Sequence, residues 1–187
     1  MTGDWAFGSE ADAAPAYERV RFTCTDGTRV SLVDSRALSV MRLHAPGAFQ
    51  LPRLGPEPLT DAFTATGLRD AIAQRRGPIK PVLLDQKIVA GIGNIYAAEA
   101  LWEARIHPES LADKLSLTRL TRLVDAVRVV LLRAQGERYH VTAPADAPYE
   151  FNVYDREGER CMRDDGVVRR IVQAGRSTYF CAACQRR

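Results

Sequence analysis

The sequence predicts an α+β chain with three parts: a short β-sheet, a cluster of helices, and a β-hairpin finger that carries metal ligands. Three observations predict this fold class. Apolar and polar residues alternate near the N-terminus, apolar residues recur every three or four positions in the middle, and three cysteines flank strand-like segments near the C-terminus. The first pattern is typical of strands, the second of helices, and the third of a zinc site.

The composition is that of an ordinary globular protein. With 187 residues, 46% of them hydrophobic and 26% charged, the chain can form one domain or two small lobes. No apolar run approaches the roughly 18 residues of a membrane span. The first twenty residues lack the basic start and hydrophobic core of a secretory signal. We therefore expect a cytoplasmic location.

Residues 17–43 are expected to form the sheet. Residues 17–24 and 29–36 alternate in polarity around Asp26 and Gly27, which predicts a hairpin. Residues 39–43 are predicted to add a third strand. Because so small a sheet leaves an edge unpaired, we expect that edge to invite a partner chain or self-association.

A connector rich in proline and glycine, residues 44–60, precedes the helical part. Thr60 and Asp61 are candidate caps of the first helix. In the last helix leucine and valine recur at helical spacing, which predicts a face buried in a core. The expected helical segments are 61–76, 80–93, 94–106 and 116–135.

The C-terminal segment is predicted to be a two-stranded finger. Residues 166–173 and 177–181 are strand-like, and the turn between them holds Ala174, Gly175 and Arg176. A hairpin of this size buries too little area to be stable alone. We therefore expect a metal ion to support it.

The expected metal ligands are three cysteines and one aspartate. Asp164 stands where a C-x2-C spacing would place a fourth sulfur. Zinc accepts a carboxylate oxygen, so we expect one structural zinc ion, bound more weakly than by four sulfurs. Asp165 is the alternative carboxylate. The expected ligands are Cys161, Asp164, Cys181 and Cys184.

Positive charge is concentrated in this finger. From Arg156 to the C-terminus eight arginines stand against four acidic residues, within a formal net charge of +3 for the chain. A basic lobe on a near-neutral body is typical of a protein that binds a polyanion. A solvated arginine-rich tail is the alternative.

Several motifs together resemble the formamidopyrimidine-DNA glycosylase and endonuclease VIII family, usually called Fpg/Nei. They are LGPEPL at 54–59, the segment 79–109 that contains KIVAGIGNIYAAEALW, VYDREGERC at 153–161, and GRSTYFCAACQ at 175–185. The resemblance covers nearly the whole chain. It implies a remnant of an N-terminal β-sandwich in residues 1–58, a helix-two-turn-helix domain in 59–136, a linker in 137–150 and a zinc finger in 151–187.

The start of one helix is the first expected DNA contact. Gly91 and Gly93 would let a phosphate approach the main chain, and Asn94 would open the helix with its own amide donor. A plain turn is the alternative on spacing alone. In the family that this segment resembles, the matching asparagine grips the phosphate next to the lesion. The resemblance makes Arg176 and Tyr154 two further phosphate contacts.

Three N-terminal residues are implied to act at the lesion. Arg36 matches the family residue that enters the stack beside the flipped nucleotide, and Leu38 stands where the family commonly has an aromatic wedge. Met1 matches the methionine that fills the void left by the flipped base.

This chain is expected to differ from the family in its catalytic residues. The family's enzymes use the amine of an N-terminal proline as nucleophile, followed by a glutamate, with a lysine on a later turn. This chain reads Met-Thr-Gly at its start, so we expect damaged-DNA binding without base excision. Lys80 and Lys87 are weak candidates for a residual AP lyase amine, with Glu99 to assist. Surface or phosphate-contacting roles are the simpler expectation for both lysines.

Two other functions stay open. One is an active DNA glycosylase and AP lyase with a misassigned start or a substitute nucleophile. The other is a zinc-ribbon module that binds a protein partner. The principal expectation is a nucleoid-associated protein whose partner is double-stranded DNA with a lesion, an abasic site or a distortion, and which does not contact membranes.

Overall fold

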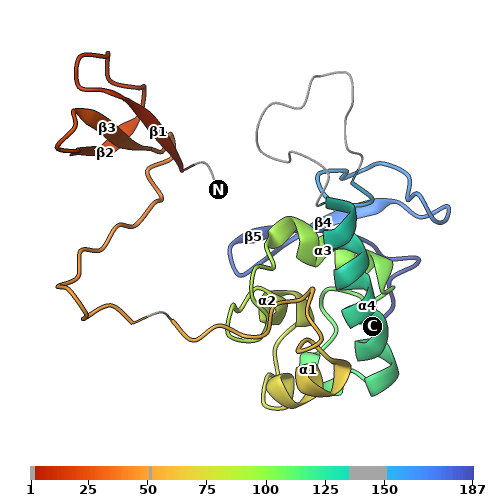
Figure 1. Cartoon of the computed structure of the whole chain (residues 1–187). Helices are drawn as coiled ribbons and strands as arrows, with labels where there is room; N and C mark the ends of the chain where they lie inside the picture. Colours follow the sequence, from red (N-terminus) through yellow and green to blue (C-terminus); the bar gives the residue numbers. More distant parts are fainter. Residues whose placement is uncertain (1–2, 51, 135–150) are drawn as a thin grey trace. The chain divides into compact units, whose positions relative to one another are not determined.

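The computed structural model describes residues 3–50, 52–134 and 151–187 (Figure 1). The chain divides into two compact units, Met1–Leu51 and Pro52–Arg187. No helix among the described residues is long and apolar enough to cross a membrane. The expected linker at 137–150 lies outside the described residues.

The first unit is an antiparallel sheet of three strands in the order β1-β3-β2. The strands are β1 (Asp4–Ser9), β2 (Glu18–Thr23) and β3 (Thr28–Val33). The expected hairpin is formed by β2 and β3, and its turn contains Gly27 at a φ of +83°. A type of turn that needs positive φ favours glycine at that position.

The prediction of a strand at residues 39–43 is wrong. The third strand is β1, which pairs with the other side of β3. The Asp34 carboxylate accepts hydrogen bonds from the main-chain N–H groups of Leu38 and Ser39, at 2.8 and 2.7 Å. Because these groups are then unavailable for a strand ladder, the chain turns away from the sheet after β3.

One face of this sheet is apolar and open to solvent. Trp5, Phe7 and Phe22 all project from it and are exposed, and the rings of Trp5 and Phe22 lie 6.3 Å apart. The strand register places Val30 and Leu32 on the same face. Aromatic side chains in such positions normally pack against a second layer of structure.

The second unit contains the helical cluster. Its core gathers buried apolar side chains from every helix, among them Leu68, Leu101 and Leu123. The longest helix packs against the first and third helices (Figure 1). The helices are α1 (Ala65–Ile72), α2 (Ile79–Leu83), α3 (Asn94–Glu103), the 3-10 turn η1 (Ala112–Lys114) and α4 (Leu117–Ala134).

The first helix begins later than the sequence predicts. Its N-cap is Thr64, whose hydroxyl accepts a hydrogen bond from the Gly67 N–H at 3.0 Å, and not Thr60 or Asp61. A threonine hydroxyl that bonds the third N–H of a helix is a favourable cap. The two earlier candidates precede the helix in a turn.

The predicted helical segment at 80–93 contains only α2, followed by turns. The Gln86 side chain accepts a hydrogen bond from the Gly91 N–H and donates one to the Ile92 carbonyl, and Gly91 adopts a φ of +74°. These local bonds replace helical ones. Gly55 packs against the same turn, since a Cβ on Gly55 would lie 2.6 Å from the Ile88 main chain.

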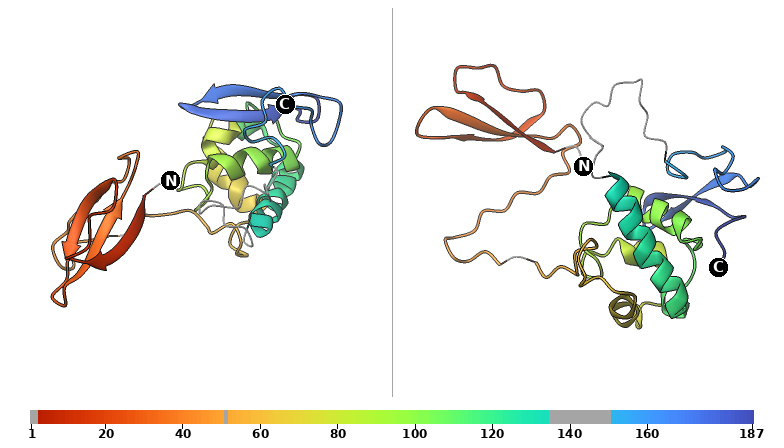
Figure 2. Two further views of the ribbon diagram at one scale, coloured as in Figure 1. Left: turned by 90° about the horizontal axis from the view of Figure 1, so that it is seen from above. Right: turned by 45° about the vertical axis from the view of Figure 1, so that its right-hand side comes forward.

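The finger has the two expected strands. They are β4 (Val168–Gln173) and β5 (Arg176–Cys181), joined by Ala174 and Gly175, which both have positive φ. The hairpin packs against α3 through β5 (Figure 2), and Lys80 of α2 donates a hydrogen bond to Thr178 of β5. A second apolar cluster fills the contact and includes Ala98, Trp102, Val153, Val168 and Tyr179.

Candidate nucleic-acid interface and metal centre

The N-terminus of α3 presents bare main chain. Gly93 is the N-cap residue and supplies no side-chain cap, and the first N–H groups of any α-helix lack a partner within the helix itself. A Cβ built on Gly91 or Gly93 would meet nothing within 4 Å. At Gly93 the φ is −102°, so neither crowding nor conformation requires glycine there. A bare helix N-terminus of this kind is suited to an anion.

Asn94 is held in place from two sides. Its amide oxygen accepts a hydrogen bond from Lys80 Nζ at 2.5 Å, and its amide nitrogen donates to the Ser177 carbonyl at 3.0 Å. Lys80 Nζ also donates to Thr178 Oγ1 at 2.9 Å and to the Ser177 carbonyl at 3.3 Å. We call these four residues the Lys80 network. It joins α2, α3 and β5, and it leaves one amide hydrogen of Asn94 for a ligand.

Lys80 is not the surface side chain that the sequence suggests, because it is completely buried. Burial, and then the like charge of Arg176, lower the pKa of Lys80 from 10.5 to about 8. Its three hydrogen-bond acceptors are all neutral. A buried ammonium beside a second cation is unfavourable unless an anion approaches. Lys87, by contrast, is exposed on the turn after α2.

Arg176 lies at the tip of the finger. It is the first residue of β5, opposite Gln173, and it is exposed. Its charge is near enough to Lys80 to lower that lysine's pKa. The finger therefore brings an exposed guanidinium and the buried ammonium to the same edge as the α3 N-terminus.

Glu99 is not available to assist catalysis. Its carboxylate is buried and accepts four hydrogen bonds of 2.8–2.9 Å, from the Asn152 amide and main chain and from the N–H groups of Val153 and Tyr154. It fixes the segment that leads into the finger onto α3. The Tyr154 ring packs edge-on against Tyr179, with 5.1 Å between centroids.

Four side chains at the base of the finger converge as a metal centre. Ligand atoms of Cys161, Asp164, Cys181 and Cys184 all lie within 4.8 Å of one another. The Cys161 and Cys184 sulfurs are 4.0 Å apart, and Cys181 Sγ is 3.4 Å from Asp164 Oδ1. Tetrahedral zinc with ordinary bond lengths requires about 3.8 Å between sulfurs and about 3.5 Å between sulfur and oxygen. The donor set and its spacing therefore fit zinc.

The surroundings of the centre also fit a cation. A Cβ on Gly166 would lie 2.7 Å from Cys181 Sγ and 2.9 Å from Asp164 Oδ1, so this glycine keeps the space open. Burial and the neighbouring thiols raise the pKa of Cys184 to about 12. A cation offsets both effects, because it stabilises the thiolate form.

The two candidate aspartates are separated by the structure. Asp164 points into the cluster and accepts a hydrogen bond from the Gly166 N–H at 2.9 Å. Asp165 is exposed and pairs with Arg160. The indole N–H of Trp102 donates to Cys161 Sγ at 3.4 Å. This bond ties the metal centre to α3, the helix that carries Asn94.

The residues expected to act at the lesion lie in the other compact unit. Leu38 is 70% exposed, and the Arg36 main-chain N–H bonds the Asp34 carboxylate. Both belong to Met1–Leu51, whereas the Lys80 network belongs to Pro52–Arg187. Met1 lies outside the described residues.

Sequence reasoning missed the structural roles of Lys80, Glu99 and Thr178. Glu99 carries a signal, since it is one acidic residue within the apolar run AAEALW, and such a residue needs a buried partner. Lys80 carries a weaker one in its apolar neighbours Ile79 and Pro81. Thr178 carries none, because its partner is 98 residues away.

Comparison with known families and structures gives a consistent result. The model of the formamidopyrimidine-DNA glycosylase H2TH domain matches residues 54–141, and that of a zinc finger found in FPG and IleRS matches residues 158–187. The solved complex of Lactococcus lactis Fpg with DNA containing an abasic site has a TM-score of 0.80 and 27% identity, covering 100% of this chain and 73% of that one. A complex of MutM with DNA containing carbocyclic 8-oxo-G has a TM-score of 0.79 and 26% identity.

These matches confirm the fold class: an α+β chain with part of a β-sandwich, a helix-two-turn-helix region and a C-terminal β-hairpin finger with a structural zinc site. The formamidopyrimidine-DNA glycosylase of Paracoccus denitrificans is 45% identical over 91% of this chain, which spans 65% of that relative's length. That of Erythrobacter litoralis is 44% identical over 100% of this chain and 72% of its own length. The chain belongs to the formamidopyrimidine-DNA glycosylase family.

Proposed function

We propose that these 187 residues bind double-stranded DNA that carries an abasic site or a similar distortion. The Lys80 network is the observation that carries this proposal. A buried ammonium with only neutral acceptors, a second cation at Arg176 and a bare helix N-terminus all favour an anion at one edge. A DNA phosphate supplies that anion, and phosphate contacts position a protein without reading bases.

Each residue of this clamp has a proposed role. Asn94 donates its remaining amide hydrogen to the phosphate, and the main chain at Gly91 and Gly93, just before α3, lies against it. Arg176 contacts the next phosphate from the finger. Tyr154, fixed by Glu99, offers its hydroxyl to the backbone. The zinc ion holds the finger to α3 through Cys161 and its bond from Trp102.

The preference for damaged DNA rests on Arg36 and Leu38. An exposed leucine side chain can enter a base stack that is already weakened, and an arginine can then face the unpaired base. Among the similar structures, the Lactococcus lactis protein is bound to DNA that contains an abasic site. The substrate we propose has the same kind of distortion.

Base excision is not part of the proposed activity of these residues. Of the two lysines considered as substitute nucleophiles, Lys80 is buried and donates to three acceptors, and Lys87 is an exposed side chain on the turn after α2. Schiff-base chemistry needs a free amine within reach of the sugar C1′. Lys80 is therefore assigned to positioning Asn94.

Binding is tested by fluorescence anisotropy with a duplex that contains a tetrahydrofuran abasic analogue and with its undamaged counterpart. We expect tighter binding of the damaged duplex. Asn94→Ala and Arg176→Gln should each weaken binding of both duplexes by about tenfold, or about 1.4 kcal/mol. Arg76→Gln, which removes an exposed charge after α1, is the matched control. Equal effects of the control and the two clamp variants would contradict the proposal.

Excision is tested on the same preparation. Borohydride treatment with an abasic-site duplex should leave no covalent adduct, and a duplex with 8-oxoguanine should stay intact. An adduct that maps to Lys80, Lys87 or the terminal amine would replace the proposal with the active-lyase alternative. Undetectable DNA binding with intact zinc and fold would favour the zinc-ribbon alternative.

A further inference from the structure

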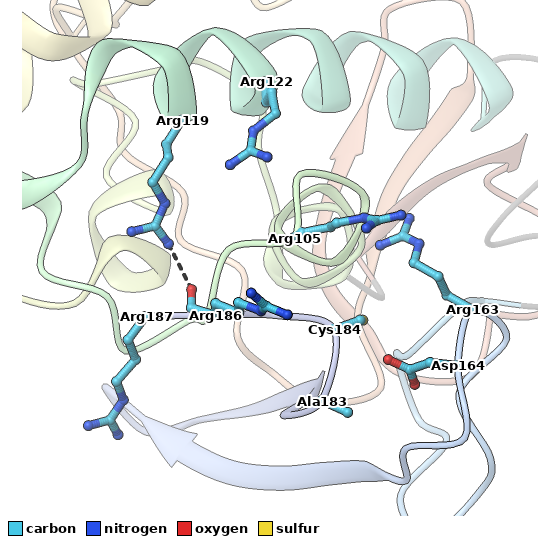
Figure 3. Close-up of a pocket in the computed structure, with 9 residues that line it drawn as sticks. All are labelled: Arg105, Arg119, Arg122, Arg163, Asp164, Ala183, Cys184, Arg186 and Arg187. Atoms are coloured by element: carbon cyan, nitrogen blue, oxygen red, sulfur yellow. Dashed lines mark hydrogen bonds between the residues drawn. The ribbon is translucent and has the colours of Figure 1, made fainter.

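The second unit has a hollow that the proposed DNA clamp does not use. It has a volume of about 520 Å³ and lies between α4, the segment after α3 and the C-terminus (Figure 3). Six arginines line it, with Asp164 as the one acidic side chain of its lining. The arginines are Arg105, Arg119, Arg122, Arg163, Arg186 and Arg187.

Three of these arginines are held by the protein. Arg119 donates to the Arg186 carbonyl at 2.7 Å, the dashed line in Figure 3. The Arg163 guanidinium lies 3.7 Å from the centre of the Trp102 ring and pairs with Glu103. Arg187 pairs with Glu109 at 2.5 Å. These contacts form a fixed frame around the hollow.

The other three, Arg105, Arg122 and Arg186, form no ion pair with any described residue. They come from three separate segments and line the same space (Figure 3). Like charges gathered in this way repel, and burial together with Arg122 lowers the pKa of Arg119. Without a ligand, moving these arginines apart would lower their electrostatic repulsion.

The position of Arg105 follows from the way in which α3 ends. Its φ is +57°, its N–H donates to the Trp102 carbonyl at 3.1 Å, and the Ile106 N–H donates to the Leu101 carbonyl at 2.9 Å. This pattern is the Schellman motif, which ends many helices. It places the exposed Arg105 in the lining of the hollow.

The lining indicates the ligand's chemistry. It contains no aromatic side chain on which a base could stack. A guanidinium group can donate hydrogen bonds to two oxygens at once, and this bidentate geometry suits phosphate. Asn94 is the first residue of α3 and Arg105 follows the C-cap Ala104, and this helix of ten residues is about 15 Å long. The hollow is therefore separate from the edge where the DNA phosphate is proposed.

We propose that this arginine hollow binds a compact polyphosphate, either inorganic or the triphosphate part of a nucleotide. The two sources share a chain of linked phosphates, which Arg105, Arg122 and Arg186 contact while the other three arginines fix the walls. The site goes beyond the proposed DNA binding and does not depend on it.

The test is calorimetric titration of the zinc-loaded chain with tripolyphosphate, with ATP and with orthophosphate. We expect tripolyphosphate to bind more tightly than orthophosphate. Equal affinity for ATP identifies the phosphate chain as the ligand, and higher affinity for ATP identifies a nucleotide. The double variant Arg105→Gln/Arg122→Gln should bind tripolyphosphate at least tenfold more weakly. Arg69→Gln/Arg76→Gln removes the same charge outside the hollow and should have no such effect.

Three controls keep the result interpretable. Zinc content and melting temperature are measured for each variant, and Arg186→Gln alone, at an exposed position, is used if the double variant is unstable. Zinc release is followed with an indicator dye, because tripolyphosphate chelates zinc. Abasic-site duplex is titrated in parallel.

Three outcomes would overturn the proposal. The first is a binding heat that zinc extraction fully explains. The second is an equal loss of tripolyphosphate affinity in the two double variants. The third is displacement of tripolyphosphate by duplex DNA. The last would make the hollow an extension of the DNA footprint, and the double variant would then lose DNA affinity as well. An unchanged DNA affinity with lost tripolyphosphate binding is the expected pattern.

Discussion

Replacing Lys80 by methionine tests whether the buried amine is prepared for a phosphate. The substitution keeps the apolar stem of the side chain and removes the three hydrogen bonds of Nζ. Asn94 then loses the contact that fixes its amide. We expect DNA affinity at pH 7 to fall by about tenfold to a hundredfold, which corresponds to about 1.4–2.7 kcal/mol.

The pH dependence separates this role from a general loss of charge. The pKa of Lys80 in the free protein is lowered from 10.5 to about 8, and a bound phosphate raises it again. DNA binding above pH 8 is therefore coupled to proton uptake. Affinity should fall as the pH rises from 8 towards 10, by at most about tenfold per pH unit.

Stability of the free protein should change in the opposite direction. Between pH 8 and 10.5 the unfolded lysine holds its proton while the folded one has lost it. The unfolded state binds more protons in this interval, so stability rises with pH there. The upper limit of the gain is about 3 kcal/mol, from about 1.4 kcal/mol per unit of pKa. Urea unfolding of the zinc-loaded chain measures it.

The pH dependence of DNA affinity and that of stability should both be absent in Lys80→Met. Both should be present in Lys87→Met, which removes an exposed lysine. Comparing variants cancels the titration of the cysteines, which is common to all three proteins. The reasoning is refuted if wild-type DNA affinity is flat between pH 8 and 10, or if Lys80→Met keeps the slope.

Two further predictions concern the supports of the finger. Glu99→Gln replaces a carboxylate that accepts four hydrogen bonds by an amide with one acceptor oxygen; urea unfolding should show a loss of about 2–4 kcal/mol, and Glu103→Gln on the same helix, at a half-buried position, should lose much less. Asp164→Cys completes a four-sulfur site; zinc competition with a chelator should show binding tighter by about tenfold, or 1.4 kcal/mol. An unchanged zinc affinity would mean that Asp164 is not a ligand.

Helices and strands whose structure is decided by neighbouring residues were predictable from the sequence. The β2–β3 hairpin follows from alternating polarity around Gly27, and α4 follows from leucine and valine at helical spacing. The finger strands follow from their composition and the turn at Gly175. In each of these, neighbours along the chain decide the structure.

The errors arose where a side chain bonds the main chain or a distant segment. Asp34 binds the N–H groups of Leu38 and Ser39, where the predicted strand at 39–43 would begin, and Gln86 binds the main chain of the turn after α2. Lys80 looks like a surface residue until β5 covers it. No local pattern contains that information, because the covering residues are almost a hundred positions away.

The bond from Trp102 to Cys161 gives the protein an optical signal. The chain has two tryptophans. Trp102 is 6% exposed and touches the sulfur of a metal ligand, whereas Trp5 is 48% exposed on the sheet of the other unit. A thiolate that gains or loses a metal ion changes the quenching of the indole beside it, while a water-soluble quencher reaches mainly Trp5. The two emissions therefore report separately on the finger and on the sheet, without any added label.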